Sequence, residues 1–211
     1  MTVYLIRHGQ SATNLAAQFT GQLDVPLSEL GRQQAQRVGE YFLGVHIDKI
    51  YSSDLSRAMD TVALLAKTHR VPLETAKEFR EIYAGDWQGM KFDDIKASYP
   101  DEYAVWMNDI GNCICTNGES VKELLDRVLG KLREIAVLHH GETVVIATHA
   151  TPIRALLAYF QDGNLNNMNR VQWVPNASVT KLCYENGVFI PVQIGDVSHL
   201  EGMLSTLKGN V

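Results

Sequence analysis

Short apolar runs along the chain predict the strands of a buried sheet. Residues 3–6 and 143–148 are the clearest, because both consist of aliphatic, β-branched or aromatic residues without a charge. Such runs are typical of parallel strands that are covered on both faces. Residues 48–53 and 71–75 predict two further short strands. Residues 178–184 and 188–194 flank Asn186-Gly187, a strong signal for a β-hairpin.

Apolar residues at helical spacing predict helices between these strands. After Ser28, which suits an N-cap, the spacing continues until Gly44 ends the helix. Helices are also predicted from about Ser56, over residues 119–138 and over residues 152–160. Strands that alternate with helices imply parallel βαβ units. The predicted fold class is therefore α/β, a three-layer α/β/α domain with a mostly parallel sheet.

Residues 82–118 interrupt this regular pattern. Glycine, proline, tyrosine and tryptophan punctuate short helical pieces here, so we expect a small helical cap that could roof a pocket. The aromatic and aliphatic residues of this cap either favour a partly apolar leaving group or pack the cap itself. No repeat or linker divides the sequence, and we expect residues 1–211 to form one domain with this insertion. Residues 200–211 are expected to form a loosely held tail.

Composition narrows the class of protein. The 211 residues are 45% hydrophobic and 20% charged, as in ordinary globular proteins, and a net charge of −5 does not favour nucleic acid. No apolar run approaches the length of a membrane span, and the start lacks the features of a secretory signal. Three cysteines indicate reduced thiols, and Cys113-Ile114-Cys115 lacks the second pair that a zinc site needs. We expect a cytoplasmic protein with no nucleic-acid or membrane partner.

Two of the predicted strands end in a histidine. His8 follows Arg7 after the first strand, and His149 follows the strand that ends at residue 148. If these strands are neighbours, both imidazoles lie at the carboxyl edge of the sheet, where α/β proteins bind ligands. Arg57 lies in the first turn of a predicted helix, and helix N-termini bind anions. These residues predict a local cationic pocket, with Glu81 where the chain leaves the sheet.

Several blocks in a fixed order carry a resemblance to a known family. The blocks are Arg7-His8-Gly9, Asn14, Leu27-Ser28 with Gly31, residues 52–58, Arg80-Glu81, residues 85–89, Gly118-Glu119-Ser120 and Thr148-His149. Together they resemble the histidine phosphatase superfamily, in the branch of cofactor-dependent phosphoglycerate mutases and broad-specificity, PhoE-like phosphatases. Residues 176–178 and 196–200 are similar to the family's ending. The resemblance implies a phosphoglycerate mutase-like fold.

The resemblance also implies a reaction. His8 would attack a phosphomonoester in line and form a phosphohistidine, which requires a neutral imidazole. Arg7, Arg57 and His149 would bind the phosphoryl oxygens and stabilise the transition state. Glu81 would protonate the leaving alcohol and later take a proton from the water that hydrolyses the phosphohistidine. No metal ion or cofactor is expected, because guanidinium groups neutralise the phosphate charge.

Three further residues are assigned to phosphate binding by the same resemblance: Asn14, Gln22 and Ala150. Two neighbouring positions depart from the family pattern. Thr13 stands where many relatives have tryptophan, and Gln10 where they have glutamate or serine. Both are lining positions, so the departures concern the identity of the substrate more than the chemistry.

Hydrolysis of a small-molecule phosphomonoester is the function that the sequence favours. Phosphoglycerate mutase chemistry is one alternative, but the glycolytic mutases resemble longer chains with a basic segment after the acid glutamate. Here residues 82–118 contain only Lys91 and Lys96 as basic residues. A non-catalytic phosphate-binding module is the other alternative, and the presence of Glu81 argues against it, because a binder needs no proton donor. Both a monomer and a homodimer remain open.

Overall fold

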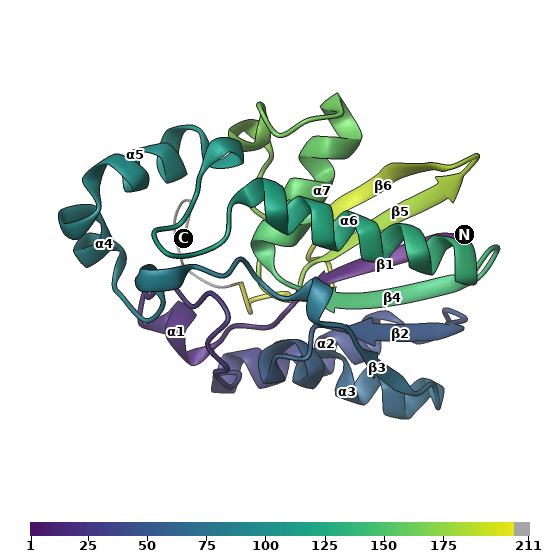
Figure 1. Ribbon diagram of the computed structural model, residues 1–211. Helices are drawn as coiled ribbons and strands as arrows, with labels where there is room; N and C mark the ends of the chain where they lie inside the picture. The colour runs from purple at the N-terminus through teal and green to yellow at the C-terminus, as the bar shows by residue number, and fades with distance from the viewer. Residues whose placement is uncertain (205–211) are drawn as a thin grey trace.

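A six-stranded sheet forms the centre of the molecule. We describe residues 1–204 of the protein in a computed structural model (Figure 1). The strands are β1 (Thr2–Arg7), β2 (Lys49–Ser52), β3 (Leu73–Thr75), β4 (Thr143–Thr148), β5 (Val179–Glu185) and β6 (Val188–Asp196). Their order in the sheet is β3-β2-β4-β1-β5-β6. The first four strands in this order are parallel, and β5 and β6 run antiparallel to their neighbours, so the sheet is mostly parallel as predicted.

Seven α-helices accompany the sheet in the described residues. They are α1 (Ala12–Leu15), α2 (Glu29–Tyr41), α3 (Ser56–His69), α4 (Phe92–Ser98), α5 (Pro100–Asn108), α6 (Val121–Leu138) and α7 (Ala150–Asp162). Four short 3₁₀ turns complete the description: η1 (Lys77–Phe79), η2 (Gly85–Trp87), η3 (Ile110–Asn112) and η4 (Met168–Arg170). None of the helices within residues 1–204 is long and apolar enough to cross a bilayer.

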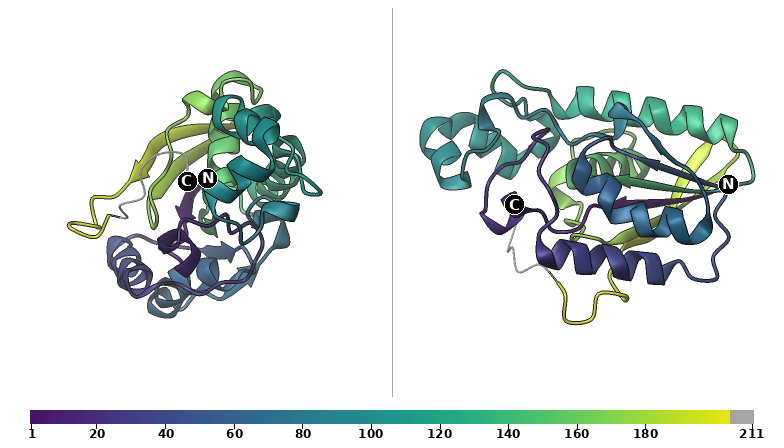
Figure 2. Two further views of the ribbon diagram at one scale, coloured as in Figure 1. Left: turned by 90° about the vertical axis from the view of Figure 1, so that its left-hand side faces the viewer. Right: turned by 90° about the horizontal axis from the view of Figure 1, so that it is seen from below.

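The helices cover both faces of the sheet (Figure 2). Alternate residues of β1 point to opposite faces, so that Val3 and Leu5 pack in one core and Tyr4 and Ile6 in the other. Helices α6 and α7 contribute their apolar side chains to the first core, and α2 and α3 contribute theirs to the second. These layers are the predicted three-layer α/β/α arrangement.

Strand register places the two histidine-bearing loops side by side. Strands β1 and β4 are parallel neighbours, with Arg7 opposite Thr148 at their last positions. The residues that follow, His8 and His149, therefore leave the sheet together at its carboxyl edge. Helices α1, α4 and α5 lie beyond this end of the sheet (Figure 1), so the short helices predicted within residues 82–118 stand at the edge where β1 and β4 end.

Two local expectations differ from the structure, and one short helix was not predicted. Helix α7 begins at Ala150, two residues before Pro152, because His149 itself has the extended backbone of an N-cap. The loop after β1 contains α1, which Ser11 and Asn14 stabilise as a capping box. The expectation of a loose tail from residue 200 is wrong at its start, because Leu200 is buried in the core. Its last part, residues 205–211, lies outside the described residues.

Candidate active site

His8 is held at the carboxyl end of β1 with a defined tautomer. Its Nδ1 lies 2.7 Å from the carbonyl oxygen of Gly9. A carbonyl only accepts hydrogen bonds, so Nδ1 carries the proton and Nε2 keeps its lone pair. Glycine is required next to His8, because a Cβ on Gly9 would lie 2.7 Å from the carbonyl oxygen of Gly31. The close approach fixes the loop after β1 against the start of α2.

His149 is fully buried beside His8, with the two ring centroids 5.0 Å apart. Its Nε2 lies 2.9 Å from the hydroxyl of Ser53, at the end of β2. Within residues 1–204, the Nδ1 atom of His149 has no hydrogen-bond partner. If the Ser53 hydroxyl donates to Nε2, Nδ1 carries the ring proton and is a buried donor without a partner in the described residues.

Arg7 and Arg57 supply the positive charge. Arg7 donates to the carbonyl of Val174 at 2.7 Å. Arg57, in the first turn of α3, donates to the carbonyls of Leu23 and Gly21 at 2.7 and 2.8 Å. In the part of the chain that is described, neither Nε atom has a partner. The two guanidinium groups are thus held by backbone carbonyls, with donors left over for an anion.

Burial and charge act in the same direction on the two histidines. Burial, followed by the charges of Arg57 and Arg7, holds the pKa of His8 well below its usual value. The pKa of His149 is also held well below its usual value, first by burial and then by Arg57. Burial lowers the pKa of both Arg7 and Arg57 to about 10, which leaves both charged at neutral pH. A neutral imidazole between cations is the form that acts as a nucleophile.

These histidines make stability depend on pH. The unfolded chain protonates both near pH 6.5, whereas the folded chain keeps them neutral to lower pH, so the unfolded state binds more protons below pH 6.5. Each histidine therefore lowers the free energy of unfolding by up to about 1.4 kcal/mol per pH unit of acidification. Urea unfolding at pH 7.5 and 5.5 should show this loss, and a smaller loss in the His8→Asn, His149→Asn double variant. An equal slope in both proteins would contradict this explanation.

Glu81 places a carboxylate close to these residues. Its Oε1 accepts from the backbone N–H of Ile82 at 2.8 Å, and its Oε2 from that of Thr151 at 3.4 Å. Glu81, His8, Arg7 and Arg57 all line one cavity that is open to solvent, whereas His149 is not part of its lining. The structure therefore brings together the residues for which the sequence predicts the roles of proton donor, nucleophile and cations.

The three residues assigned to phosphate binding are placed differently. Asn14 lines the cavity, and its Oδ1 accepts from the N–H of Ser11 at 3.1 Å, which leaves the amide nitrogen as the group that can donate to a ligand. Ala150 also lines the cavity, at the start of α7, where backbone N–H groups lack helical partners. Gln22 does not line the cavity; its Nε2 donates to the carbonyl of Glu81 at 3.1 Å.

Aromatic side chains form the outer wall of the cavity. Phe19, Phe92, Trp106 and Trp173 line it, and the rings of Phe19 and Trp106 lie 5.0 Å apart. Trp173 was not predicted, because it lies in an irregular segment far along the chain. Its ring packs 4.1 Å from the guanidinium of Arg154, which donates to the carbonyls of Met168 and Val171. Arg154 therefore holds the ring of Trp173 in this part of the wall.

The two cysteines of the cap segment form no disulfide within the described residues. Cys113 and Cys115 lie within residues 82–118, and both are free and buried in the core. Across residues 1–204, no group of three or more histidine, cysteine, aspartate or glutamate side chains is arranged to hold a metal ion.

The chain belongs to the histidine phosphatase superfamily. The model of its branch 1 matches residues 3–197, which confirms the resemblance found in the sequence. Phosphoglycerate mutase-like protein 4 of Arabidopsis thaliana is 34% identical and covers 94% of this chain and 86% of its own. Phosphoserine phosphatase 1 of Hydrogenobacter thermophilus is 35% identical over 72% of each chain. Among solved structures, Bacillus stearothermophilus YhfR superposes with a TM-score of 0.90 at 32% identity, over 94% of this chain and 98% of its own.

Proposed function

We propose that the protein hydrolyses phosphomonoesters without a metal ion, through a phosphohistidine formed on Nε2 of His8. The observation that carries this proposal is the pairing of a neutral, correctly tautomerised His8 with two buried guanidinium groups in one cavity. A carboxylate, Glu81, lines the same cavity. The phosphatase named among the relatives supports hydrolysis as the outcome.

The first step transfers the phosphoryl group to the enzyme. The Nε2 lone pair of His8 forms a bond to phosphorus as the bond between phosphorus and the ester oxygen breaks. Arg7, Arg57 and Nδ1–H of His149 bind the nonbridging oxygens, whose negative charge these donors stabilise. Glu81 in its protonated form donates its proton to the departing alcohol.

The second step releases phosphate. Glu81, now ionised, takes a proton from a water molecule, which attacks phosphorus and breaks its bond to His8. The imidazole leaves as a neutral base, and Glu81 is again protonated for the next turnover. One ester and one water are consumed, and one alcohol and one phosphate are formed. The guanidinium groups supply the positive charge that metal ions supply in other phosphoryl-transfer enzymes.

Glu81→Gln tests the proton-transfer role. The value of kcat/KM reports steps up to alcohol release, so it should fall by about 10²-fold for an alkyl phosphate, whose alkoxide is a poor leaving group. For p-nitrophenyl phosphate, whose phenolate leaves without a proton, the fall should be within about threefold. Steady-state kinetics on both esters measure the contrast. An equal loss on the two esters would count against Glu81 as the acid.

The cavity favours a small ester with a partly apolar leaving group. Its inner end is cationic, and its outer wall carries the rings of Phe19, Phe92, Trp106 and Trp173. Lys91 and Lys96 are the basic residues of the cap segment 82–118, which supports hydrolysis over the retention of a bisphosphate. We propose that the partner is a small molecule and that residues 1–211 form one domain of a monomeric or homodimeric enzyme. Because the thiols are free, we also propose a cytoplasmic location.

The function is tested by phosphate release from p-nitrophenyl phosphate and a panel of natural phosphomonoesters in excess EDTA. Release that survives EDTA supports the proposal, and the panel ranks the substrates. Transfer between positions of phosphoglycerate, without net release, would identify a mutase instead. Binding of phosphate with no turnover of any ester would identify a binding module.

A further inference from the structure

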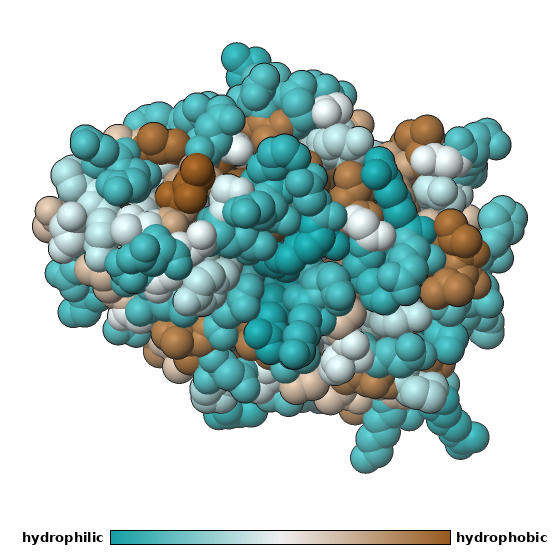
Figure 3. Space-filling view, in the orientation of Figure 1, coloured by the Kyte–Doolittle hydropathy of each residue, from teal (hydrophilic) through white to brown (hydrophobic). Residues whose placement is uncertain are grey.

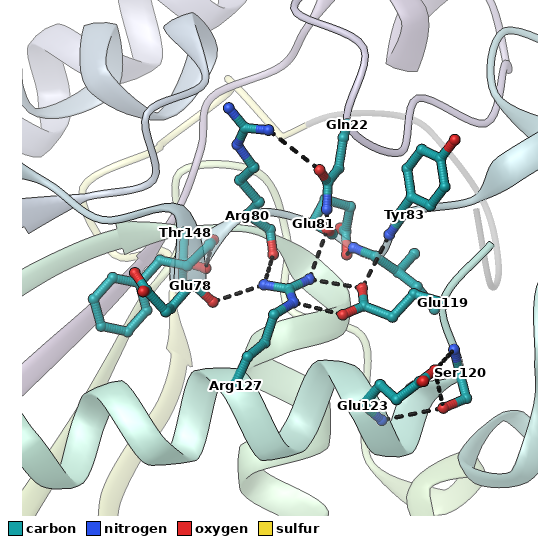
Figure 4. A network of polar contacts seen from close by, with 12 residues as sticks. Gln22, Glu78, Arg80, Glu81, Tyr83, Glu119, Ser120, Glu123, Arg127 and Thr148 are labelled. Atoms are coloured by element: carbon teal, nitrogen blue, oxygen red, sulfur yellow. Dashed lines mark hydrogen bonds and ion pairs between the residues drawn. The ribbon is translucent and has the colours of Figure 1, made fainter.

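One arginine outside the cavity binds the backbone that carries Glu81 (Figure 4). Arg127, on α6, donates to the carbonyls of Glu78, Arg80 and Glu81 at 2.7, 2.8 and 2.9 Å. The carbonyl of Phe79, between them, accepts from the hydroxyl of Thr148 at 2.8 Å. Each carbonyl from residue 78 to residue 81 thus has a side-chain donor.

Glu119 fixes Arg127 and the other side of Glu81. Its carboxylate binds Arg127 with both oxygens, at 2.6 Å to Nε and 2.9 Å to NH2. The same carboxylate accepts from the backbone N–H of Tyr83 at 3.1 Å, and the N–H of Glu119 donates to the carbonyl of Tyr83 at 2.7 Å. The backbone is therefore held on both sides of Glu81, by two residues that bind each other.

The anchor of this network is rigid. On the same helix, Val128 directly follows Arg127 and Leu124 lies three residues before it. The side chains of Val128 and Leu124 are fully buried in the core. Ser120 caps the start of α6 through a capping box with Glu123 (Figure 4). A planar fork with five donors can serve three carbonyls and a carboxylate at once, which a lysine cannot.

The network acts from outside the cavity. Glu78, Arg80, Glu119 and Arg127 line an open hollow on the outer surface, and Arg127 does not line the cavity of the active site. The middle of the face that α6 crosses is hydrophilic, in keeping with this hollow (Figure 3). Arg127 and Glu119 therefore contact the proposed site through the backbone of the segment that carries Glu81. The charge of Arg127 also helps to lower the pKa of His149, after burial and the charges of Arg57 and His8.

We propose that Arg127 and Glu119 are positioning residues for the proton transfer by Glu81; the proposal rests on the proposed function. Gln22 belongs to the same system, because its amide donates to the carbonyl of Glu81 at 3.1 Å and its Oε1 accepts from Arg80 at 3.3 Å. This assigns to Gln22 a role on the backbone of the acid instead of on phosphate.

Arg127→Gln and the milder Arg127→Lys test the proposal. Displacing a catalytic group by about 1 Å costs on the order of 10²-fold, so kcat/KM for an alkyl phosphate should fall 10- to 100-fold. For p-nitrophenyl phosphate, which needs no proton donor, it should fall within about threefold. Arg133→Gln is the matched control, because Arg133 lies on the same helix and contacts Tyr159 instead of the Glu81 segment. It should keep the wild-type ratio of the two rates, and thermal unfolding should show that all three variants are folded.

A double-mutant cycle with Glu81→Gln decides whether the effect passes through Glu81. If it does, Arg127→Gln added to Glu81→Gln should change kcat/KM for the alkyl phosphate by less than about twofold. The positioning role would be overturned if Arg127→Gln lowered kcat/KM by the same factor in the wild-type and the Glu81→Gln backgrounds, or by the same factor on the two esters. The phosphatase proposal would stand in either case. Absence of turnover in the wild-type protein would overturn both.

Discussion

His8→Ala is expected to lower kcat/KM on every phosphomonoester by about 10⁴-fold or more. The reason is geometric: Nε2 of His8 is an unprotonated ring nitrogen in the cavity that Arg7 and Arg57 also line. Without it, the phosphoryl group has no acceptor on the enzyme, and water would have to attack phosphorus directly while Glu81 serves as the acid for the leaving group. The measurement is the initial rate of phosphate release over a range of ester concentrations in excess EDTA, which gives kcat/KM.

The control for His8→Ala is His140→Ala, since His140 is exposed after α6, at the opposite edge of the sheet. It should keep wild-type activity. Binding of inorganic phosphate to the His8→Ala protein should persist, because the arginines remain. Substantial residual hydrolysis in His8→Ala would exclude the phosphohistidine mechanism.

Arg57→Ala is expected to lower kcat/KM by about 10³-fold, for two reasons that act together. It removes a charged donor to the transition state, which costs about 10²- to 10³-fold by itself. It also releases the carbonyls of Gly21 and Leu23, so the loop that lines the cavity loses its anchor. Because the charge of Arg57 lowers the pKa of His8, its removal should also move the acid limb of the activity profile to higher pH.

The Arg57→Lys variant separates charge from geometry. It should recover the pH profile more fully than the rate, because an ammonium supplies the charge but not the fork. Arg37→Ala on the exposed face of α2, where Arg37 pairs with Glu40, is the control. A loss within about tenfold in Arg57→Ala, with the acid limb unchanged, would contradict the assigned role.

The central elements were predictable because their signals are local. The uncharged runs of β1 and β4 and the apolar stripe of α6 each lie within one stretch of sequence. That His8 and His149 meet depends on the strand order, which periodicity does not contain and the resemblance supplied. The glycine at position 9 marks a backbone contact with Gly31 that only the fold reveals.

The parts that were not predicted depend on contacts between distant segments. Arg127 lies in an amphipathic helix, where an arginine on the polar face is unremarkable in the sequence, yet it binds backbone some 46 to 49 residues away. Trp173 is similar, because its place in the cavity wall depends on Arg154 and on the turn η4. Gln22 was assigned by analogy to phosphate, and its side chain turns to Glu81 instead.

Trapping the covalent intermediate tests the central claim most directly. In Glu81→Gln, p-nitrophenyl phosphate should still phosphorylate the enzyme, while hydrolysis of the phosphohistidine is slowed for want of a base. After a rapid alkaline quench, which preserves phosphohistidine, peptide mapping should find one phosphoryl group on His8, and none in the His8→Ala, Glu81→Gln double variant. Phosphate release by the wild-type enzyme, with no phosphopeptide in either protein or with the phosphoryl group on another residue, would contradict the mechanism.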